Sequence, residues 1–240
     1  MFDTGIIKNK NAFVTGSTGA IGKAIAIGLA KTGCNLFLTA TDYKSLEKLA
    51  IELSIYDVNV SYAVANLSNK DEIYYVIDEV KRLNISIDII INSAGIWPKM
   101  SLFDIQDEDY EDVMNINFRA AFIFIREFSK NMVQRDWGRI VNIGSSSAYF
   151  GFGETSLYCA SKHALLGFSR SIHDELKQHN VRTFCISPSS TKSKMSEIDK
   201  KQDHSTFLDP SDVAEYIIFA ISHNSNIVSD EIFLKRMFIR

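Results

Sequence analysis

Proline is scarce in this chain, with three residues in 240. Linkers between domains are often rich in proline, glycine or polar residues. No such stretch, internal repeat or low-complexity tract interrupts the sequence. We therefore expect residues 1–240 to form a single domain, a length that suits one large α/β fold.

Cysteine is also scarce, because the chain holds only Cys34, Cys159 and Cys185. The number is odd, and no C-x-x-C pair or cluster of Cys and His accompanies it. This argues against a disulfide framework and against a zinc site. We expect no metal ion in the site and a reducing, cytoplasmic compartment.

An excess of charge of one sign is missing as well. The chain has 26 Lys and Arg residues and 29 Asp and Glu residues, so its net charge is −3. This balance gives no electrostatic basis for binding nucleic acid or an anionic membrane surface. No run reaches the ~18 apolar residues of a membrane span, and the first residues lack the pattern of a signal peptide. The partners that we expect are small molecules.

The chain does show a regular alternation of short apolar runs and longer segments with helical periodicity. The expected strands are residues 11–15, 36–39, 58–65, 87–91, 139–143, 181–186 and 227–234. The expected helices are residues 21–32, 43–54, 70–83, 107–133, 156–179 and 211–222. This order predicts a doubly wound parallel sheet of seven strands, a Rossmann fold, with helices on both faces. The helix at 107–133 is rather apolar, which fits either a subunit interface or a well-buried helix.

A glycine-rich turn follows the first expected strand and opens the first expected helix. Such a turn presents backbone N–H groups and the positive end of a helix to a phosphate. Gly16 permits the tight turn, Gly19 or Ala20 lets the backbone approach a pyrophosphate, and Gly22 permits close packing of helix on sheet. The residues assigned to this dinucleotide site are Gly16, Ser17, Thr18, Gly19, Ala20, Ile21 and Gly22.

Tyr158 and Lys162 lie four residues apart in the expected helix 156–179, so their side chains share one face. An ammonium beside a phenol favours the phenolate and lowers its pKa from about 10, which makes a tuned acid. Ser145 follows the expected strand 139–143, so it stands at the carboxyl end of a strand, where open α/β sheets bind ligands. Taken alone, the Tyr and Lys pair also fits an ordinary surface helix.

Small and polar residues end two further strands. Asn66, which Leu67 follows, either hydrogen-bonds an adenine or serves as a helix N-cap or turn residue. Asn92, Ala94 and Gly95 follow the fourth expected strand and leave room for a flat ring or a ribose. Asn92 alternatively only ties neighbouring strands together.

In their order and spacing, these residues resemble the short-chain dehydrogenase/reductase family over about residues 10–228. The motifs that carry the resemblance are Thr15-Gly16-x-x-x-Ala20-Ile21-Gly22, Asn66-Leu67, Asn92-Ser93-Ala94-Gly95, Asn117, Ser145, Tyr158-x-x-x-Lys162 and Pro188. The resemblance implies that Tyr158 is the general acid/base and that Ser145 hydrogen-bonds the substrate carbonyl. It also implies that Lys162 holds the nicotinamide ribose and lowers the pKa of Tyr158.

The same resemblance implies that Asn117 kinks the long helix and holds a water of a proton relay, with Asn115 as a rival. It assigns Pro188 and Ser193 to the cofactor site and residues 189–208 to a substrate loop. The implied protein is an NAD(P)(H)-dependent oxidoreductase, a homodimer or homotetramer. It interconverts a carbonyl and a secondary alcohol by hydride transfer while Tyr158 moves the proton.

The choice of cofactor depends on the end of the second expected strand. A carboxylate there would bind the ribose hydroxyls of NAD and repel a 2′-phosphate. Neither Thr39 nor Ala40 carries one, and the hydroxyls of Thr39 and Thr41 suit a phosphate. We therefore favour NADP over NAD, although Asp42 lies close enough to argue the other way.

Three functions stay open. We favour a reductase of 3-oxoacyl thioesters, the 3-oxoacyl-ACP reductase role that is commonest in this subgroup. A sugar or small hydroxy-acid dehydrogenase comes second, because residues 226–236 lack the Gly-Gly ending common in fatty-acid-type reductases. A non-catalytic nucleotide-binding sensor or partner subunit comes third, because Ala20 and Ser189 replace glycines of the family pattern.

Overall fold

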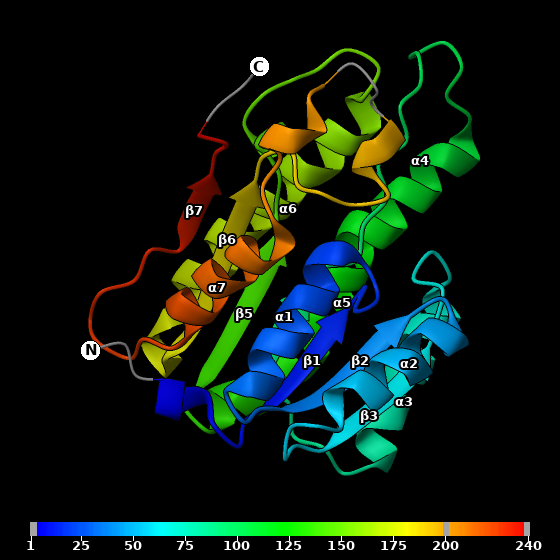
Figure 1. Cartoon of the computed structure of the whole chain (residues 1–240). Coiled ribbons are helices and arrows are strands. Elements are labelled where there is room, and N and C mark those ends of the chain that lie inside the picture. The colour runs from blue at the N-terminus through cyan, green and yellow to red at the C-terminus, as the bar shows by residue number, and fades with distance from the viewer. Residues whose placement is uncertain (1–3, 199–201, 238–240) are drawn as a thin grey trace.

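The structure is a computed structural model that describes residues 4–198 and 202–237. Its strands form one parallel sheet in the order β3-β2-β1-β4-β5-β6-β7 (Figure 1). The strands are β1 (Asn11–Thr15), β2 (Asn35–Ala40), β3 (Val60–Val64), β4 (Ile89–Asn92), β5 (Gly138–Ile143), β6 (Val181–Pro188) and β7 (Glu231–Leu234). The predicted doubly wound sheet of seven strands is therefore confirmed, and its order reverses between β1 and β4.

Helices connect the strands and cover both faces of the sheet. The α-helices are α1 (Ala20–Lys31), α2 (Tyr43–Leu53), α3 (Lys70–Arg82), α4 (Asp107–Met114), α5 (Ala120–Gln134), α6 (Ser156–Leu176) and α7 (Pro210–Ile221). Short 3-10 turns are Thr4–Ile7, Ser146–Ala148, Lys177–His179, Ser196–Ile198 and His204–Thr206. Within the described residues, no helix is both long and apolar enough to cross a membrane.

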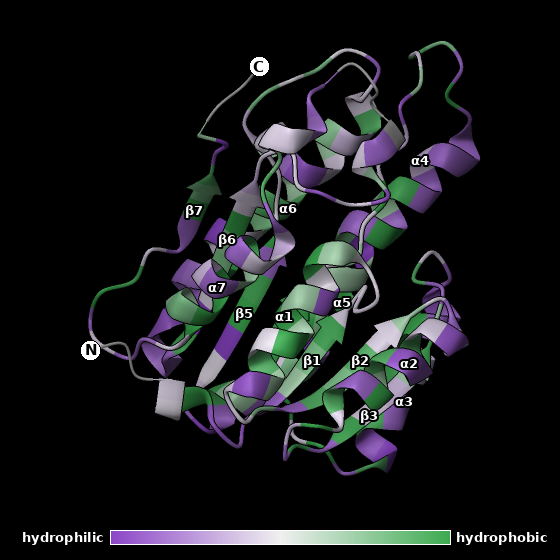
Figure 2. Cartoon of the chain, viewed as in Figure 1, coloured by the Kyte–Doolittle hydropathy of each residue, from purple (hydrophilic) through white to green (hydrophobic). Residues whose placement is uncertain are grey.

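The core has two layers because successive side chains of a strand point to opposite faces of the sheet. On β1, Val14 packs among apolar residues of α1, α2 and α7, whereas Phe13 packs among those of α3, α5 and α6. The central strands β4 and β5 are buried throughout, as expected of a parallel sheet covered on both sides. Figure 2 shows largely hydrophobic strands, whereas hydrophilic stretches stand out on helices such as α2, α3 and α4.

The expected helix at 107–133 differs in one respect from the structure. It consists of α4 and α5, joined by a π-helical turn over Asn115–Arg119. A π turn holds one more residue than an α turn, so periodicity alone does not reveal it. The buried residue of this turn is Asn117, the position that the sequence predicts to kink the helix.

The two edge strands are shorter than expected. The predicted strand 58–65 is reduced to Val60–Val64, and the predicted strand 227–234 begins only at Glu231. Ile227 is 80% exposed, so an apolar residue in sequence does not here mean a buried strand position. An edge strand pairs on one side only and ends where that pairing ends.

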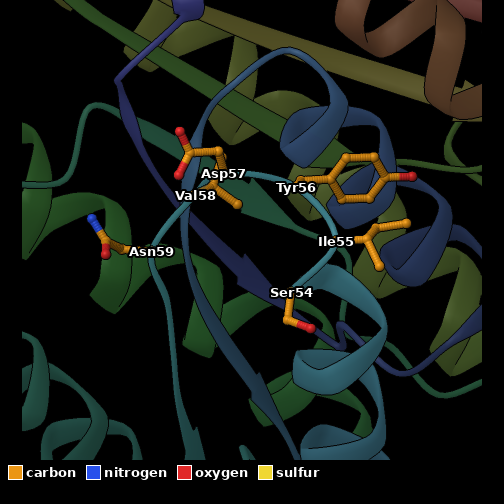
Figure 3. Close-up of a pocket in the computed structure, with 6 residues that line it drawn as sticks. All are labelled: Ser54, Ile55, Tyr56, Asp57, Val58 and Asn59. Carbon is orange, nitrogen blue, oxygen red and sulfur yellow. The ribbon is translucent and has the colours of Figure 1, made fainter.

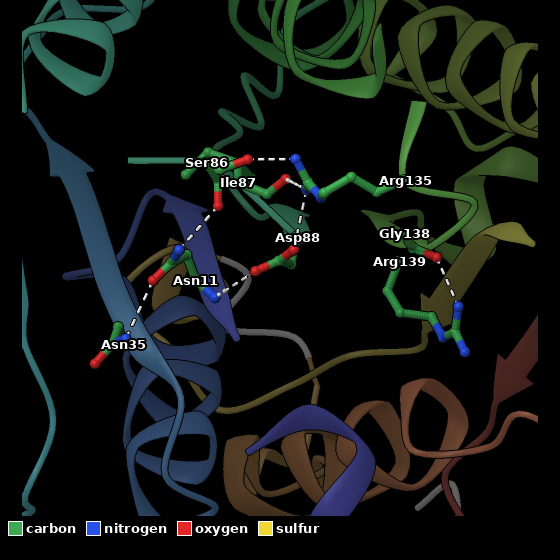
Figure 4. Close-up of polar contacts among 8 residues, drawn as sticks. All are labelled: Asn11, Asn35, Ser86, Ile87, Asp88, Arg135, Gly138 and Arg139. Atoms are coloured by element: carbon green, nitrogen blue, oxygen red, sulfur yellow. Dashed lines mark hydrogen bonds and ion pairs between the residues drawn. The ribbon is translucent and has the colours of Figure 1, made fainter. Parts of the chain in front are cut away.

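Polar side chains cross-link the amino ends of the central strands (Figure 4). The Asp88 carboxylate accepts hydrogen bonds from the backbone N–H of Asn11 (3.0 Å) and from Nη2 of Arg135 (3.0 Å). The side-chain amide of Asn11 donates to the carbonyl of Ser86 (2.9 Å) and accepts from Asn35 (3.1 Å). Every amide and charged group of this set has a partner, so the amino edge of the sheet is closed by hydrogen bonds.

Arg139, at the same edge, is fully buried, and no carboxylate within residues 4–198 and 202–237 forms an ion pair with it. Its guanidinium lies 4.5 Å from the ring centroid of Trp137. It donates instead to four carbonyl oxygens and one amide oxygen, those of Ile221 (3.1 Å), Gly138 (2.7 Å), Asn180 (3.1 Å), His223 (3.0 Å) and Asn224 (2.9 Å). Arg139 thereby ties β5 to the end of α7.

Candidate active site

A cavity of about 620 Å³ opens at the opposite edge, among the loops that follow the carboxyl ends of β4, β5 and β6. In Figure 1 this edge lies toward the top of the view, where the strand arrows point. The predicted site residues that line the cavity are Ile21, Gly95, Ser145, Tyr158, Lys162, Pro188 and Ser193. The sequence therefore identified residues from five separate segments that the fold brings together.

Other predicted residues lie outside this lining. Those of the glycine-rich turn are Gly16, Ser17, Thr18, Gly19, Ala20 and Gly22, and those near the other strand ends are Thr39, Thr41, Asn66, Leu67, Asn92 and Ala94. The side-chain amide of Asn92 donates to Asn142 Oδ1 (2.8 Å), and Asn66 Oδ1 accepts from the N–H of Ser68 (3.1 Å). For both asparagines, the side chain makes the contact of the structural alternative, a tie between strands and a turn.

The glycine-rich turn is built for close approach of backbone. Gly16 has φ of +60°, and a Cβ there would lie 2.8 Å from the Cα of Ala94. A Cβ on Gly22 would lie 2.3 Å from the carbonyl oxygen of Gly16. Ala20 stands at the first position of α1 and has no positive φ, so replacing glycine there causes no backbone strain.

The first turn of α1 leaves its N–H groups available. Gly19 is the N-cap and supplies no side-chain cap, and the first turn contains no acidic residue. Unpaired N–H groups at the start of a helix attract an anion, and the helix dipole adds to this attraction. The turn therefore fits the pyrophosphate of a dinucleotide, on geometry as well as on sequence.

Ser145 and Tyr158 come from different elements and meet at the cavity. Ser145 caps the 3-10 turn after β5, and its Oγ accepts from the N–H of Ser147 (3.1 Å). Tyr158 lies in the first turn of α6, one turn before Lys162. A hydrogen bond from Ser145 lowers the pKa of Tyr158, which links the two hydroxyls.

Lys162 is 4% exposed, and its Nζ donates to the carbonyl oxygen of Ile143 at the end of β5 (2.7 Å). Its Nζ lies 5.6 Å from the ring centroid of Tyr158. Burial lowers the pKa of Lys162 to about 8, because the interior disfavours a charged amine.

The prediction that Lys162 lowers the pKa of Tyr158 is wrong for this structure. Burial raises the pKa of the phenol above its ordinary value, the hydrogen bond with Ser145 opposes the rise, and Cys159 adds to it. The physical reason is that a buried phenolate loses more hydration than its neighbours restore. Tyr158 is accordingly held as the neutral phenol.

Asn117 stands behind the cavity and fixes the loop after β4. Its Oδ1 accepts from the N–H of Ile96 (2.8 Å), and its Nδ2 donates to the carbonyl of Ile96 (3.0 Å) and to Oγ of Ser161 (3.0 Å). A Cβ on Gly95 would lie 3.3 Å from Asn117 Oδ1 and 3.8 Å from Lys162 Nζ. The rival Asn115 turns away and donates to the carbonyl of Ser68 (3.2 Å).

Sequence reasoning missed one wall of the cavity. Phe150 and Phe152 lie in the loop before α6, and Phe233, Lys235 and Arg236 belong to β7 and the segment after it. The predicted substrate loop at 189–208 does contribute, through residues such as Phe207, and Trp97 of the loop after β4 also lines the cavity. Residues 145 and 236 are too far apart in the sequence for a spacing motif to connect them. The only sequence signal for this wall was the basic pair Lys235-Arg236 after an apolar strand.

A second hollow, of about 430 Å³, lies on the loop between α2 and β3 (Figure 3). All its lining residues belong to one continuous stretch, Ser54, Ile55, Tyr56, Asp57, Val58 and Asn59. This loop precedes β3, so it stands at the amino edge of the sheet, away from Tyr158. One loop supplies every side chain here, and no acid–base pair accompanies them.

Comparison with known proteins agrees with this geometry. The family model for short chain dehydrogenases matches residues 10–204. The 3-oxoacyl-(acyl-carrier-protein) reductase FabG of Rickettsia typhi (strain ATCC VR-144 / Wilmington) is 31% identical, over 92% of this chain and 93% of that protein. Nodulation protein G of Rhizobium meliloti (strain 1021) is 34% identical, over 80% of this chain and 77% of that protein.

Solved structures give the same picture. A dehydrogenase/reductase from Sinorhizobium meliloti 1021 is 28% identical and has a TM-score of 0.84, covering 97% of this chain and 96% of that one. A structure described as a putative betaketoacyl-ACP reductase is 25% identical, with a TM-score of 0.82 over 95% of this chain and 97% of that one.

Proposed function

The chain belongs to the short-chain dehydrogenase/reductase family, and we propose that it is an NADP(H)-dependent enzyme in which Ser145, Tyr158 and Lys162 interconvert a carbonyl and a secondary alcohol. The observation that carries the proposal is the convergence of these three side chains on one cavity. This cavity lies beside a glycine-rich turn that fits a dinucleotide phosphate. The cofactor supplies the hydride, and the chain supplies orientation and the proton.

The protonation states favour reduction of a carbonyl. Tyr158 is held as a neutral phenol, so its O–H is available to the substrate oxygen. Ser145 carries a second hydroxyl beside it, and two donors on one oxygen stabilise the charge that develops there. Lys162 keeps its positive charge below a pH of about 8, because burial lowers its pKa to about 8.

Asn117 acts on the site by positioning. Its amide joins the loop after β4 to Ser161 of α6, one residue before Lys162. We propose that it also holds a water that passes a proton onward to the amine of Lys162. This relay stays a prediction.

The preference for NADP is supported by the surroundings of Asp42. Its carboxylate caps α2, and the N–H of Ser45 (2.7 Å) occupies one of its oxygens. Hydrogen bonds from the side chain and then from the N–H of Ser45 lower the pKa of Asp42. Thr41 is exposed at the end of β2, while Lys23 pairs with Glu52 (2.7 Å). We expect NADPH to bind at least ~10-fold more tightly than NADH, measured by fluorescence titration, and Thr41→Asp to reverse the order.

The substrate is best approached through the relatives. Those named 3-oxoacyl-(acyl-carrier-protein) reductase make a 3-oxoacyl thioester the first compound to test. A sugar or small hydroxy acid is the second candidate, because polar residues from the segment after β6 and basic residues from the segment after β7 enter the cavity wall. A non-catalytic sensor or partner subunit is disfavoured by the assembled hydroxyls and amine.

The decisive experiment is a panel of carbonyl compounds reduced with NADPH by the wild-type chain and by Tyr158→Phe. Loss of the phenol removes the proton donor, so we expect turnover to fall about 10²–10⁴-fold while NADPH binding persists. A variant as active as the wild type on every substrate would contradict the mechanism. A wild-type chain that binds NADPH and reduces none of the panel would support the sensor.

We further propose that residues 1–240 act as one dinucleotide-binding domain and assemble as a homodimer or homotetramer. Phe118 and Phe122 of the helix after β4 pack edge-on against Phe168 of α6, with ring centroids 5.7 and 5.9 Å apart. Phe122 remains 37% exposed, so this aromatic face is open to a second copy. Light scattering on the wild type and on Phe122→Glu tests the interface, and a monomeric variant is the expected result.

We propose a cytoplasmic location because the three cysteine thiols form no disulfide. Cys34, Cys159 and Cys185 are buried and unpaired, as expected in a reducing compartment.

A further inference from the structure

The substrate end of the cavity carries an unusual balance of charge. Its described lining includes four cationic side chains and no Asp or Glu, the cations being Lys99, Lys162, Lys235 and Arg236. Lys99 pairs with Glu154 at a distance of 3.7 Å, and Lys162 is used by the reaction. Lys235 and Arg236 remain, and within the described residues neither lies within 4.0 Å of a carboxylate.

Arg236 is held in place at the cavity wall. Its backbone N–H donates to Oγ of Ser189 (3.0 Å), the serine that replaces a glycine of the family pattern. Its guanidinium lies 5.0 Å from the ring centroid of Phe207, and Nη1 donates to Oγ1 of Thr206 (3.3 Å). The side chain is therefore oriented by three neighbours, none of which neutralises its charge.

One donor of the Arg236 guanidinium lacks a partner in the part of the chain that the structure describes. Its Nε is buried and has no hydrogen-bond partner among the described residues. Of the arginines that the structure describes, two others are not exposed, Arg139 and Arg182, and each donates to several oxygen atoms of the chain. A buried N–H without an acceptor is unfavourable, and a guanidinium offers parallel donors that match the two oxygens of a carboxylate or phosphate.

We propose that Arg236 binds an oxyanion of the substrate, so that the physiological substrate is a small carbonyl compound or alcohol bearing a carboxylate or a phosphate. This inference rests on the proposed function and narrows its substrate. Trp97, Phe150 and Phe233 supply apolar surface to the same cavity. A 3-oxoacyl thioester is uncharged around its carbonyl and offers Arg236 no oxyanion there.

Anion binding by the full-length chain is the first test. Malonate and inorganic phosphate are titrated by calorimetry into the wild type, Arg236→Met and Arg236→Lys. Lys192→Met serves as the control, because it removes a charge from an exposed residue of the same loop region that does not line the cavity. We expect the wild type and the control to bind one of the two anions, and Arg236→Met to bind it at least ~30-fold more weakly.

The anion that binds tells a carboxylate substrate from a phosphate substrate. Arg236→Lys keeps the charge but loses the parallel N–H donors of the guanidinium. Its affinity for the anion should therefore fall between those of the wild type and Arg236→Met. Circular dichroism must give the same melting temperature for the variants as for the wild type. Equal binding by Arg236→Met and the wild type, or no binding of either anion by the wild type, overturns the proposal.

Turnover with NADPH is the second test, on two matched pairs of substrates. One pair is acetoacetate and methyl acetoacetate, and the other is dihydroxyacetone phosphate and dihydroxyacetone. In one pair the wild type should favour the anionic member at least ~30-fold in kcat/KM, and Arg236→Met should abolish that preference by raising KM. A preference for the neutral member, or a change only in the KM for NADPH, overturns the proposal. Anion binding that depends on Arg236, with no reduction of any carbonyl, supports the anion site and defeats the proposed function instead.

Discussion

The cations at the two edges of the sheet differ in how many hydrogen bonds they make to the rest of the chain. At the amino edge, Arg139 is fully buried and donates to five oxygen atoms of the chain. At the carboxyl edge, Lys162 has one such acceptor, the carbonyl of Ile143, and Arg236 has one weak side-chain bond. Burial lowers the pKa of Arg139 to about 9 and that of Lys162 to about 8, so both edges bear a desolvation cost.

The difference separates stability from function. Buried polar groups in proteins normally find partners, and exceptions gather at sites that act on a ligand. Among the described residues, unpartnered buried polar atoms include those of Thr39, Asn92 and Arg236 near the carboxyl edge, and also that of Ser222 beside the acceptors of Arg139. The contrast therefore lies in the cations: the guanidinium of Arg139 is bonded to five oxygen atoms of the chain, whereas Lys162 and Arg236 keep donors for other molecules.

The largest effect is expected from Ser145→Ala at the carboxyl edge. Removing one donor from the developing negative charge should lower kcat about 10²–10³-fold. The free energy of unfolding should change by no more than about 1 kcal/mol, because one N–H, that of Ser147, loses its acceptor. Steady-state kinetics and urea denaturation measure the two quantities.

The matched control is Ser86→Ala at the amino edge, where the serine hydroxyl bonds to Arg135. Its kcat should equal that of the wild type. Loss of turnover in this control, or retention of it in Ser145→Ala, would break the comparison.

Arg139→Met should do the reverse. The methionine keeps apolar packing against Trp137 but leaves several buried carbonyls without donors, so we expect a loss of about 3 kcal/mol or more in unfolding free energy. The kcat of the folded fraction should not change. Arg182→Met, which removes a half-buried guanidinium bonded to loop carbonyls, should lose only about 1 kcal/mol. Arg182 lies opposite Arg139 at the same amino edge, so equal losses in the two variants would argue against a special role for the full burial of Arg139.

Because of Lys162, the stability of the folded chain should depend on pH. Its pKa is about 8 in the folded chain, against an ordinary lysine value of 10.5, so the unfolded chain binds more protons between these values. Stability should therefore rise with pH across this window, by up to about 3 kcal/mol from this group alone. The measurement is urea denaturation of the wild type and Lys162→Met at pH 8 and pH 10.5, and the variant should lack the increment.

Enzymatic activity should instead fall as the pH rises. As pH rises through about 8, Lys162 loses its charge, and kcat/KM should decline on the alkaline side. A pH profile that stays flat to a pH of about 10 would show that the ammonium is not needed.

Ser189→Gly is expected to have the smallest effect. It restores the family glycine but removes the acceptor of the Arg236 backbone N–H. The segment after β7 should become less ordered, so KM for an anionic substrate should rise by only about 3-fold, which corresponds to less than about 1 kcal/mol. An unchanged KM would mean that this serine does not orient Arg236.

The fold was predictable because its signal is local. Strands such as β4 and β5 are continuous apolar runs, and the helices between them keep the helical period, so type and order followed from the sequence. The π-helical turn at Asn115–Arg119 and the late start of β7 were not predicted, because both depend on packing rather than on composition.

The site was predictable in part for the same reason. Ser145, Tyr158 and Lys162 lie near one another in sequence and carry recognisable spacing, and the structure brings them to one cavity. The direction of the Tyr158 pKa was not predictable, because it depends on burial that no spacing reveals. Arg236 was missed because it reaches the cavity through the pairing of β6 with β7, a contact between distant segments.

The π-helical turn over Asn115–Arg119 makes this enzyme sensitive to changes in chain length at one point. An α-helix advances about 100° per residue, so deleting one residue within the turn would rotate all of α5 by that angle relative to α4. Phe124 and Phe128, now buried against the sheet, would swing toward solvent, or else α4 would turn and carry Asn117 away from Ile96. Insertions and deletions here force a choice between a packed core and a positioned amide.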